Sequence, residues 1–353
     1  FYSLTKCKLF RMTELTLGDA AHKARIRTCS PDTTLFLTSA ATVNAEANTS
    51  HEYSCMLRTP HARDKEVVLN TCAVVTGGNK GIGFEICRQL ASNGISVVLT
   101  SRDVTKGLEA VEKLKNSFGL SNVVFHQLDV MNPTTIPPLA DFIRTQFGKL
   151  DILVNNAGIG GVTTDVAGFL ALMKGVVEMD QNKQKNEMDR NKEKQHLKQV
   201  ITETVELAEV CLQTNYYGVK SVTKAFIPLL QLSGSPRIVN VSSSIGKLKN
   251  ISNGMALKML SDGNDLTEER IDETVNMFLR DFKEDLLETK GWPPYLPAYT
   301  ISKICLNAYT RILAREFPTF RINCVCPGWV KTDISYNTGV FTTKEGAERV
   351  VNL

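Results

Sequence analysis

Long hydrophobic runs and a strong charge of either sign are both missing from this sequence of 353 residues. No apolar run approaches the roughly 18 residues that a bilayer-spanning helix requires, so we expect no membrane segment. The formal net charge of +4 is small for this length, which argues against nucleic acid or a membrane surface as a partner. With 42% hydrophobic and 22% charged residues, the composition is typical of a soluble globular protein with a sizeable core.

Cysteine pairs with the spacing of metal ligands are also missing. The nine cysteines include no C-x-x-C motif, and the closest two are Cys324 and Cys326. Others, such as Cys72 and Cys305, stand in apolar patterns that are typical of buried thiols. We therefore expect neither disulfides nor a metal site, and we expect a reducing compartment such as the cytoplasm.

Histidine is scarce, and its distribution is informative. None of the five histidines lies beyond His196. A dehydrogenase that uses a histidine acid/base or a histidine-bound zinc would need one near its substrate site. Proton chemistry in the C-terminal half must therefore use another residue type.

Residues 1–66 show no sustained hydrophobic period and are interpreted as a non-globular extension. The first part is poor in acids, with only Glu14 and Asp19 before Asp32, which is typical of an organelle transit peptide and would place the protein in a plastid. Acidic residues return further on, and a gene-model artefact is the other interpretation. In both cases the folded domain is expected over residues 67–353.

From residue 67 onward, short apolar runs alternate with amphipathic helical segments. Six runs are predicted to be strands: Thr71–Val75, Ile95–Thr100, Asn122–Leu128, Asp151–Asn155, Arg237–Val241 and Phe320–Val325. Hydrophobic strands separated by helices imply a parallel sheet covered on both faces. The predicted fold class is therefore α/β, a Rossmann-type doubly wound parallel sheet.

Two insertions interrupt this alternation, at about residues 161–198 and 247–297. The first contains the charged run DQNKQKNEMDRNKEKQHLK, which predicts a solvated loop or an exposed helix, with a recognition patch as the alternative. The second contains a predicted helix with Thr267 as N-cap and acids in its first turn. Its apolar face is formed by Ile271, Val275, Phe278 and Phe282.

A glycine-rich loop, Thr76–Gly83 (TGGNKGIG), follows the first predicted strand and precedes a helix. Gly77, Gly81 and Gly83 would let the backbone approach a pyrophosphate, which sits on the N-terminus of the next helix. The loop lacks the Gly-Lys-Ser/Thr sequence of a P-loop. It therefore predicts a dinucleotide site.

The end of the second strand decides which dinucleotide is expected. NAD sites place an acid there for the ribose 2′-hydroxyl, whereas NADP sites place an arginine near the 2′-phosphate. Here Ser101 occupies the acid position, Arg102 follows it, and Lys80 could supply a second positive charge. Asp103 is the rival candidate, but it directly precedes a helix and is a natural N-cap. The pattern favours NADPH.

Tyr299 and Lys303 stand at the start of an apolar helical stretch, in the sequence YTISK. Residues four positions apart share a helix face, so the phenol and the ammonium can be neighbours. A tyrosine titrates at about pH 10, and a nearby ammonium lowers that pKa towards a value usable in general acid/base catalysis.

Other polar residues belong to the same edge of the predicted sheet. Ser243 follows the strand RIVNV, at the carboxyl end where parallel sheets bind their ligands. Ser242 and Ser244 flank it, but side chains alternate along a strand, so all three cannot point into one pocket. The motif NNAG ends the fourth strand, and Asn215 falls within the following helix. Because asparagine is mildly unfavourable inside a helix, a functional reason for Asn215 is plausible.

Together these motifs resemble those of the short-chain dehydrogenase/reductase superfamily. The resemblance rests on Thr76–Gly83, Asn155–Gly158, Asn215, Val241–Ser243, Tyr299–Lys303 and Pro327–Thr332 (PGWVKT), and it extends from about Cys72 to the C-terminus. The long segment between Ser243 and Tyr299 is similar to the plant branch that contains menthone and neomenthol reductases and salutaridine reductase, which is related to animal carbonyl reductases.

The resemblance implies NADPH-dependent reduction of a ketone or aldehyde to an alcohol, on a small apolar substrate of the terpenoid or alkaloid kind, in plant secondary metabolism. Tyr299 would protonate the carbonyl oxygen, and Ser243 would hydrogen-bond the developing alkoxide. Lys303 would lower the tyrosine pKa and bind the nicotinamide ribose. Asn215 would hold a water that links Lys303 to solvent. The implied substrate pocket contains Ser243 and Trp329.

The resemblance also implies a set of cofactor-binding residues. These are Gly77, Asn79, Lys80, Gly81, Ile82, Gly83, Ser101, Arg102, Asp129, Val130, Asn156, Ala157, Gly158, Tyr299, Lys303, Pro327, Gly328, Val330 and Thr332. Asp129 would meet the adenine, and Pro327, Gly328 and Thr332 would contact the nicotinamide end.

Two further expectations follow from the family pattern. In this branch the second insertion covers a face that relatives use for oligomerisation, which implies a monomer. Family members usually continue with a final strand after the segment that follows Pro327–Thr332, and here we expect that edge strand to be missing. The alternative function is a catalytically silent NADPH-binding or redox-sensing protein, but the presence of Tyr299, Lys303 and Ser243 favours the reductase.

Overall fold

A computed structural model describes residues 71–171, 199–261, 263 and 265–353. The extension predicted for residues 1–66 and the charged run of the first insertion lie outside the described residues.

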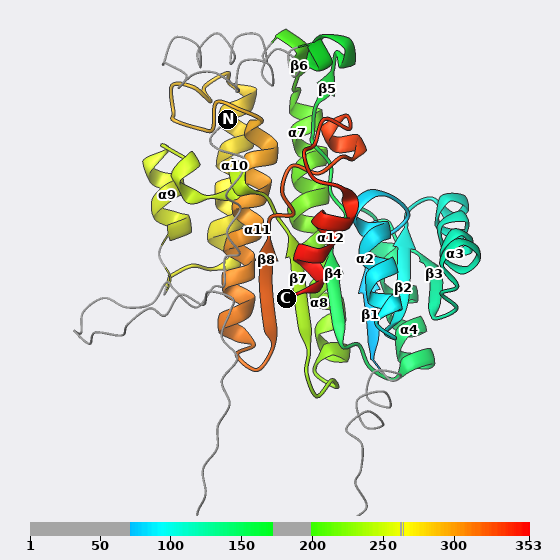
Figure 1. Ribbon diagram of the computed structural model, residues 1–353. Coiled ribbons are helices and arrows are strands. Elements are labelled where there is room, and N and C mark those ends of the chain that lie inside the picture. The colour runs from blue at the N-terminus through cyan, green and yellow to red at the C-terminus, as the bar shows by residue number, and fades with distance from the viewer. Residues whose placement is uncertain (1–70, 172–198, 262, 264) are drawn as a thin grey trace, which may run out of the picture.

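A six-stranded parallel sheet forms the centre of the molecule (Figure 1). Its strands are β1 (Cys72–Val75), β2 (Ser96–Ser101), β3 (Val123–Gln127), β4 (Ile152–Asn155), β7 (Arg237–Val241) and β8 (Arg321–Val325). They lie in the order β3-β2-β1-β4-β7-β8, and every neighbouring pair is parallel. All six predicted strands are confirmed, with ends within one residue of the prediction. β8 forms one edge, and the described residues that follow it add no further strand to this sheet.

Alternate side chains of the central strand enter two different hydrophobic cores. Cys72 and Val74 pack into the core on one face of the sheet, and Ala73 and Val75 pack into the core on the other. All four are fully buried, which explains why a doubly covered strand has a continuous apolar sequence. The Rossmann-type architecture is confirmed.

Helices cover both faces of the sheet (Figure 1). One face carries α4 (Ile136–Phe147), α7 (Val205–Leu212), α8 (Gly218–Leu230) and α11 (Pro297–Glu316). The other carries α2 (Gly81–Ser92), α3 (Val104–Phe118) and α12 (Thr343–Val351). In this part of the chain no helix combines the length and hydrophobicity needed to cross a membrane.

The second insertion forms α9 (Gly254–Ser261) and α10 (Glu268–Lys283). The Thr267 side chain accepts a hydrogen bond from the Arg270 N–H at 3.3 Å, so the predicted N-cap is confirmed. The predicted apolar face of α10 packs into the core beside α11. Polar contacts also hold α10, because Asp272 accepts hydrogen bonds from the Tyr216 hydroxyl and from Lys220, both at 2.8 Å.

The described ends of the first insertion pair with each other. β5 (Thr163–Thr164) and β6 (Ile201–Thr202) form a two-stranded antiparallel sheet. This small sheet lies at the end of the molecule from which α7 begins (Figure 1).

Candidate active site

A large cleft opens at the carboxyl ends of the parallel strands, where the strand order reverses between β1 and β4. Its volume is about 2110 Å³, more than the ~300–1,000 Å³ that a single small ligand needs. The predicted cofactor residues line it together with Ser243, Tyr299, Lys303 and Trp329, whereas Asn215 is fully buried and is not among the lining residues.

The glycine loop between β1 and α2 forms one end of the cleft. Gly77 and Gly81 have positive φ angles of 65° and 58°, which favour glycine. A Cβ on Gly83 would lie 2.3 Å from the Gly77 carbonyl oxygen, so only glycine fits there. In the described structure the N-cap residue of α2, Lys80, makes no capping hydrogen bond with its side chain. The N-terminus of α2 is therefore suited to bind an anion such as a pyrophosphate.

Asn156, at the end of β4, fixes this loop through its side chain. Its amide nitrogen donates to the carbonyl oxygens of Thr76 and Gly77 at 2.9 and 3.2 Å. In return the Thr76 hydroxyl accepts the N–H groups of Asn156 and Ala157 at 2.9 and 3.0 Å. The sequence predicted that Asn156 lies beside the cofactor, but it did not predict these hydrogen bonds. They fix the glycine loop to the NNAG motif, so two predicted cofactor motifs are held together.

The end of β2 presents a cation to the cleft. Ser101 is buried, whereas Arg102 is exposed and lines the cleft. Asp103 caps α3, because its carboxylate accepts the Lys106 N–H at 3.0 Å. The predicted N-cap is thus confirmed, and the rival carboxylate is engaged in a structural hydrogen bond.

Lys80 has a partner that sequence reasoning missed. Its ammonium forms an ion pair with the Asp333 carboxylate, and both side chains are about two-thirds exposed. Asp333 follows the Pro327–Thr332 motif, so the pair links the two chain segments that line this part of the cleft. Lys80 thus forms an exposed ion pair at the edge of the cleft, and its role as a second cation for the cofactor stays a prediction.

Asp129 and Val130, after β3, also line the cleft as expected. The Asp129 carboxylate accepts the Met131 N–H at 3.0 Å, which stabilises the turn that shapes this wall. Close packing holds the turn from behind, because a Cβ on Gly218 would lie 2.9 Å from the Val130 carbonyl oxygen.

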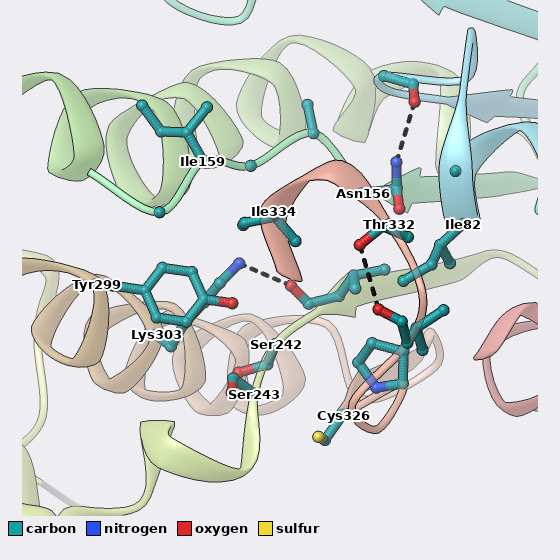
Figure 2. A pocket seen from close by; sticks show the side chains of 18 of the residues that line it. Ile82, Asn156, Ile159, Ser242, Ser243, Tyr299, Lys303, Cys326, Thr332 and Ile334 are labelled. Carbon is teal, nitrogen blue, oxygen red and sulfur yellow. Dashed lines mark hydrogen bonds between the residues drawn. The ribbon is translucent and has the colours of Figure 1, made fainter. Parts of the chain in front are cut away.

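Tyr299, Lys303 and Ser243 meet at the other end of the cleft (Figure 2). Tyr299 and Ser243 both line this part of the cleft. The Lys303 ammonium lies 5.6 Å from the centre of the Tyr299 ring and donates to the Val241 carbonyl oxygen at 2.9 Å. Ser242 points elsewhere, since its hydroxyl donates to Asn307 at 2.6 Å. All three neighbouring serines, Ser242–Ser244, line the cleft, and the choice of Ser243 as the catalytic serine stays a prediction.

Asn215 lies in a single π-helical turn, Gln213–Tyr217, between α7 and α8. Its side-chain oxygen accepts the Ile159 N–H, and its nitrogen donates to the Ile159 carbonyl oxygen, both at 2.9 Å. The same nitrogen donates to Ser302 at 3.0 Å, and the Ser302 hydroxyl donates to the Tyr299 carbonyl oxygen at 2.7 Å. Because the side-chain amide is engaged with protein groups, a water held by Asn215 would need its main-chain carbonyl.

Burial dominates the protonation of the catalytic pair. It raises the pKa of Tyr299 well above that of an ordinary phenol, while the Ser243 side chain acts in the opposite direction. Burial also lowers the pKa of Lys303 to about 8. The role expected of Lys303, to lower the Tyr299 pKa, stays a prediction, because desolvation of the phenol dominates the net shift of that pKa here. Tyr299 is therefore held in its protonated form at neutral pH.

The Pro327–Thr332 segment forms the wall opposite the glycine loop and has a fixed shape. Gly328 has a φ of 91°, and a Cβ there would lie 2.7 Å from the Phe341 ring. Trp329 donates through its ring nitrogen to the Thr338 carbonyl oxygen at 3.1 Å. It packs in a small apolar cluster formed by Phe169, Val200, Ile201, Tyr295, Trp329 and Tyr336. Val330 is buried, so it supports the wall from within.

Comparison with known proteins gives matches over most of the described chain. The family described as short chain dehydrogenase matches residues 71–255, and a further family, described as enoyl-(acyl carrier protein) reductase, matches residues 286–350. Salutaridine reductase of Papaver somniferum is 60% identical over 295 residues, which cover 83% of this chain and 93% of that protein.

Other similarities point in the same direction. The solved structure of salutaridine reductase from Papaver somniferum superposes with a TM-score of 0.73 at 62% identity, over 80% of this chain and 94% of that one. (+)-Neomenthol dehydrogenase of Arabidopsis thaliana is 56% identical over 80% of this chain and 90% of its own. Carbonyl reductase [NADPH] 1 of Rattus norvegicus is 36% identical over 80% of this chain and 89% of its own.

Proposed function

This chain belongs to the short-chain dehydrogenase/reductase family, and we propose that it is an NADPH-dependent reductase of a small cyclic ketone. The observation that carries the proposal is that Tyr299 and Ser243 line one cleft together with the buried Lys303 ammonium, which lies 5.6 Å from the centre of the Tyr299 ring. A proton donor, an oxyanion donor and a cation thus converge on one point of the cleft.

Each catalytic residue has a distinct part in the proposed reaction. Tyr299 gives its proton to the carbonyl oxygen, and burial favours the protonated phenol that this step needs. Ser243 donates a hydrogen bond to the same oxygen as negative charge develops there. Lys303 provides a positive charge beside the phenol, which stabilises the phenolate that remains after Tyr299 has given up its proton. A nicotinamide cofactor, when bound, supplies the hydride.

The cofactor end of the cleft fits a dinucleotide. Gly77, Gly81 and Gly83 allow close approach of backbone to a pyrophosphate at the N-terminus of α2. We propose NADPH rather than NADH because the exposed Arg102 is placed to meet a 2′-phosphate. An NAD site would need an acid here to bind the ribose 2′-hydroxyl, and Asp103 is the candidate. Its carboxylate instead caps α3.

The substrate end of the cleft is apolar. Ile159, Leu248, Tyr295, Trp329 and Ile334 line the same cleft as Tyr299. Such a wall suits a rigid hydrocarbon ring whose carbonyl reaches Tyr299 and Ser243. We therefore propose a terpenoid- or alkaloid-like ketone, of the kind named in salutaridine reductase and neomenthol dehydrogenase.

We also propose that the protein acts as a monomer in the cytoplasm. α10 packs on α7 and α11 and binds Tyr216 and Lys220, so it covers helix surface that would otherwise be exposed, which favours a monomer. Light scattering after gel filtration measures the mass, and a fluorescent fusion of the whole chain distinguishes the cytoplasm from a plastid.

The test is oxidation of NADPH, followed by its absorbance, against a panel of cyclic terpenoid and alkaloid ketones, with NADH as control. Turnover that requires NADPH would establish the reductase. Binding of NADPH, seen by its fluorescence, without turnover of any ketone would favour the silent binding protein instead.

A further inference from the structure

The helix that carries the catalytic tyrosine and lysine cannot cap its own N-terminus. α11 begins at Pro297, and the N-cap position is occupied by Leu296, whose hydrocarbon side chain cannot accept a hydrogen bond. Leu296 also has the left-handed conformation, with φ 43° and ψ 54°, which is unfavourable for a leucine. Such a conformation persists only where the surroundings fix it.

Glu203 supplies the missing cap from a distant part of the chain. Its carboxylate accepts the N–H of Ala298, the second residue of α11, at 3.0 Å. Ala298 is fully buried and directly precedes Tyr299. An acid at this position also interacts favourably with the positive end of the helix dipole.

Glu203 is itself held on both sides. It follows β6, which pairs with β5, and it precedes Thr204, whose side chain accepts the Leu207 N–H at 3.3 Å and caps α7. α7 lies beside α11 (Figure 1). The carboxylate therefore links the described end of the first insertion to the catalytic helix.

Burying an ionised carboxylate at this position costs free energy, which suggests that Glu203 has a specific role. Glu203 is half-buried, and burial raises its pKa to about 7, while the hydrogen bond from Ala298 opposes this. A carboxylate that is kept in such surroundings needs a compensating interaction, and its hydrogen bond to the helix end is the one that the structure shows.

The same helix end shapes the catalytic site. Tyr295, Leu296 and Tyr299 all line the cleft, and the Thr300 hydroxyl donates to the Tyr295 carbonyl oxygen at 3.0 Å. A change in the first turn of α11 would therefore move both the phenol of Tyr299 and the wall beside it.

We infer that Glu203 is a positioning residue, which holds the first turn of α11 so that the Tyr299 hydroxyl faces Ser243. The inference rests on the proposed reductase function for its kinetic consequence, but the anchoring of the helix stands independently of it.

The test compares Glu203→Gln, which keeps an oxygen acceptor, with Glu203→Met, which has similar volume and no such acceptor. Glu206→Ala is the matched control, because Glu206 is an exposed acid in the first turn of α7. We expect Glu203→Met to lower kcat roughly ten- to a hundredfold, with the Kd for NADPH changed less than about twofold. Glu203→Gln and Glu206→Ala should keep kcat within about twofold of the unmodified protein.

Retention of kcat in Glu203→Met would overturn the inference, and so would equal losses in the Met and Gln variants. Hydrogen exchange of the peptide that contains Ala298–Thr300 provides a readout without turnover. Exchange there should become roughly tenfold faster in the Met variant alone. If the unmodified protein reduces no ketone, the proposed function fails, and exchange then decides the anchoring by itself. Unchanged hydrogen exchange in the Glu203→Met variant would refute the anchoring of α11 by Glu203.

Discussion

The side chain of Asn215 and the main chain of Ile159 form a reciprocal pair of hydrogen bonds, each 2.9 Å long. The pair joins the π-helical turn between α7 and α8 to the segment that follows the NNAG motif. A third bond, to Ser302, reaches the catalytic helix. Asn215 therefore joins three segments that surround the active site, and it is fully buried among them.

Replacing Asn215 by alanine should destabilise the fold. The change leaves a cavity at a fully buried position and removes the hydrogen bonds to the half-buried main chain of Ile159 and to Ser302, and we expect a loss of about 2–4 kcal/mol in the free energy of unfolding. Urea denaturation, followed by circular dichroism, measures it. Gln231→Ala, which removes an exposed amide at the end of α8, should change stability by less than about 0.5 kcal/mol. Equal effects of the two variants would contradict the bracing role of Asn215.

Tyr299→Phe should abolish ketone reduction while NADPH still binds. The variant keeps the ring but removes the proton donor, so we expect kcat to fall about 10²- to 10⁴-fold. The Kd for NADPH, measured by fluorescence titration, should remain within about threefold because the ring keeps its packing. Near-normal turnover in this variant would mean that another group supplies the proton.

The two neighbouring serines should behave differently. Ser243→Ala removes a donor to the developing alkoxide, and we expect kcat to fall about 10²- to 10³-fold. Ser242→Ala breaks the buried hydrogen bond to Asn307 instead. It should lower stability by about 1 kcal/mol and leave kcat nearly unchanged. Steady-state kinetics and melting of both variants distinguish the roles, and the reverse pattern would reassign the catalytic serine.

Arg102→Glu should impair the use of NADPH far more than that of NADH. Loss of a charge-assisted hydrogen bond to a phosphate, with repulsion in its place, is expected to raise the KM for NADPH about ten- to a hundredfold. The KM for NADH has no 2′-phosphate to lose and should change little. Lys113→Glu makes the same charge change at an exposed position of α3, among residues that do not line the cleft. A similar response from both cofactors would refute the phosphate role of Arg102.

The sheet could be predicted because a strand that is buried on both faces has a short, continuous apolar sequence, which differs from the periodic pattern of the amphipathic helices. The bounds of β1 to β8 in the central sheet agree with the prediction, and Thr267 and Asp103 cap the helices that the sequence assigned to them. Each of these features depends on residues close together in the sequence.

Features that join distant segments could not be predicted in the same way. Lys80 and Asp333 are separated by 253 positions, and neither residue has a local pattern that points to the other. The raised pKa of Tyr299 depends on how fully the folded chain surrounds the phenol, which no motif encodes. Glu203 was missed for a similar reason, because a cap supplied by a remote loop lacks the spacing of a local capping box.

The activity should fall at alkaline pH, and Lys303 should determine where. Burial raises the pKa of Tyr299, so the phenol stays protonated at neutral pH and does not limit the reaction there. Burial lowers the pKa of Lys303 to about 8, so its positive charge is present below that pH and is lost above it. Because this charge stabilises the phenolate that forms when Tyr299 protonates the substrate, kcat for reduction should be level near neutral pH and should decline with a midpoint near 8. In Lys303→Arg the guanidinium stays charged up to about pH 12, so this midpoint should disappear even if kcat is lower. A decline near pH 8 that persists in the arginine variant would mean that another group titrates.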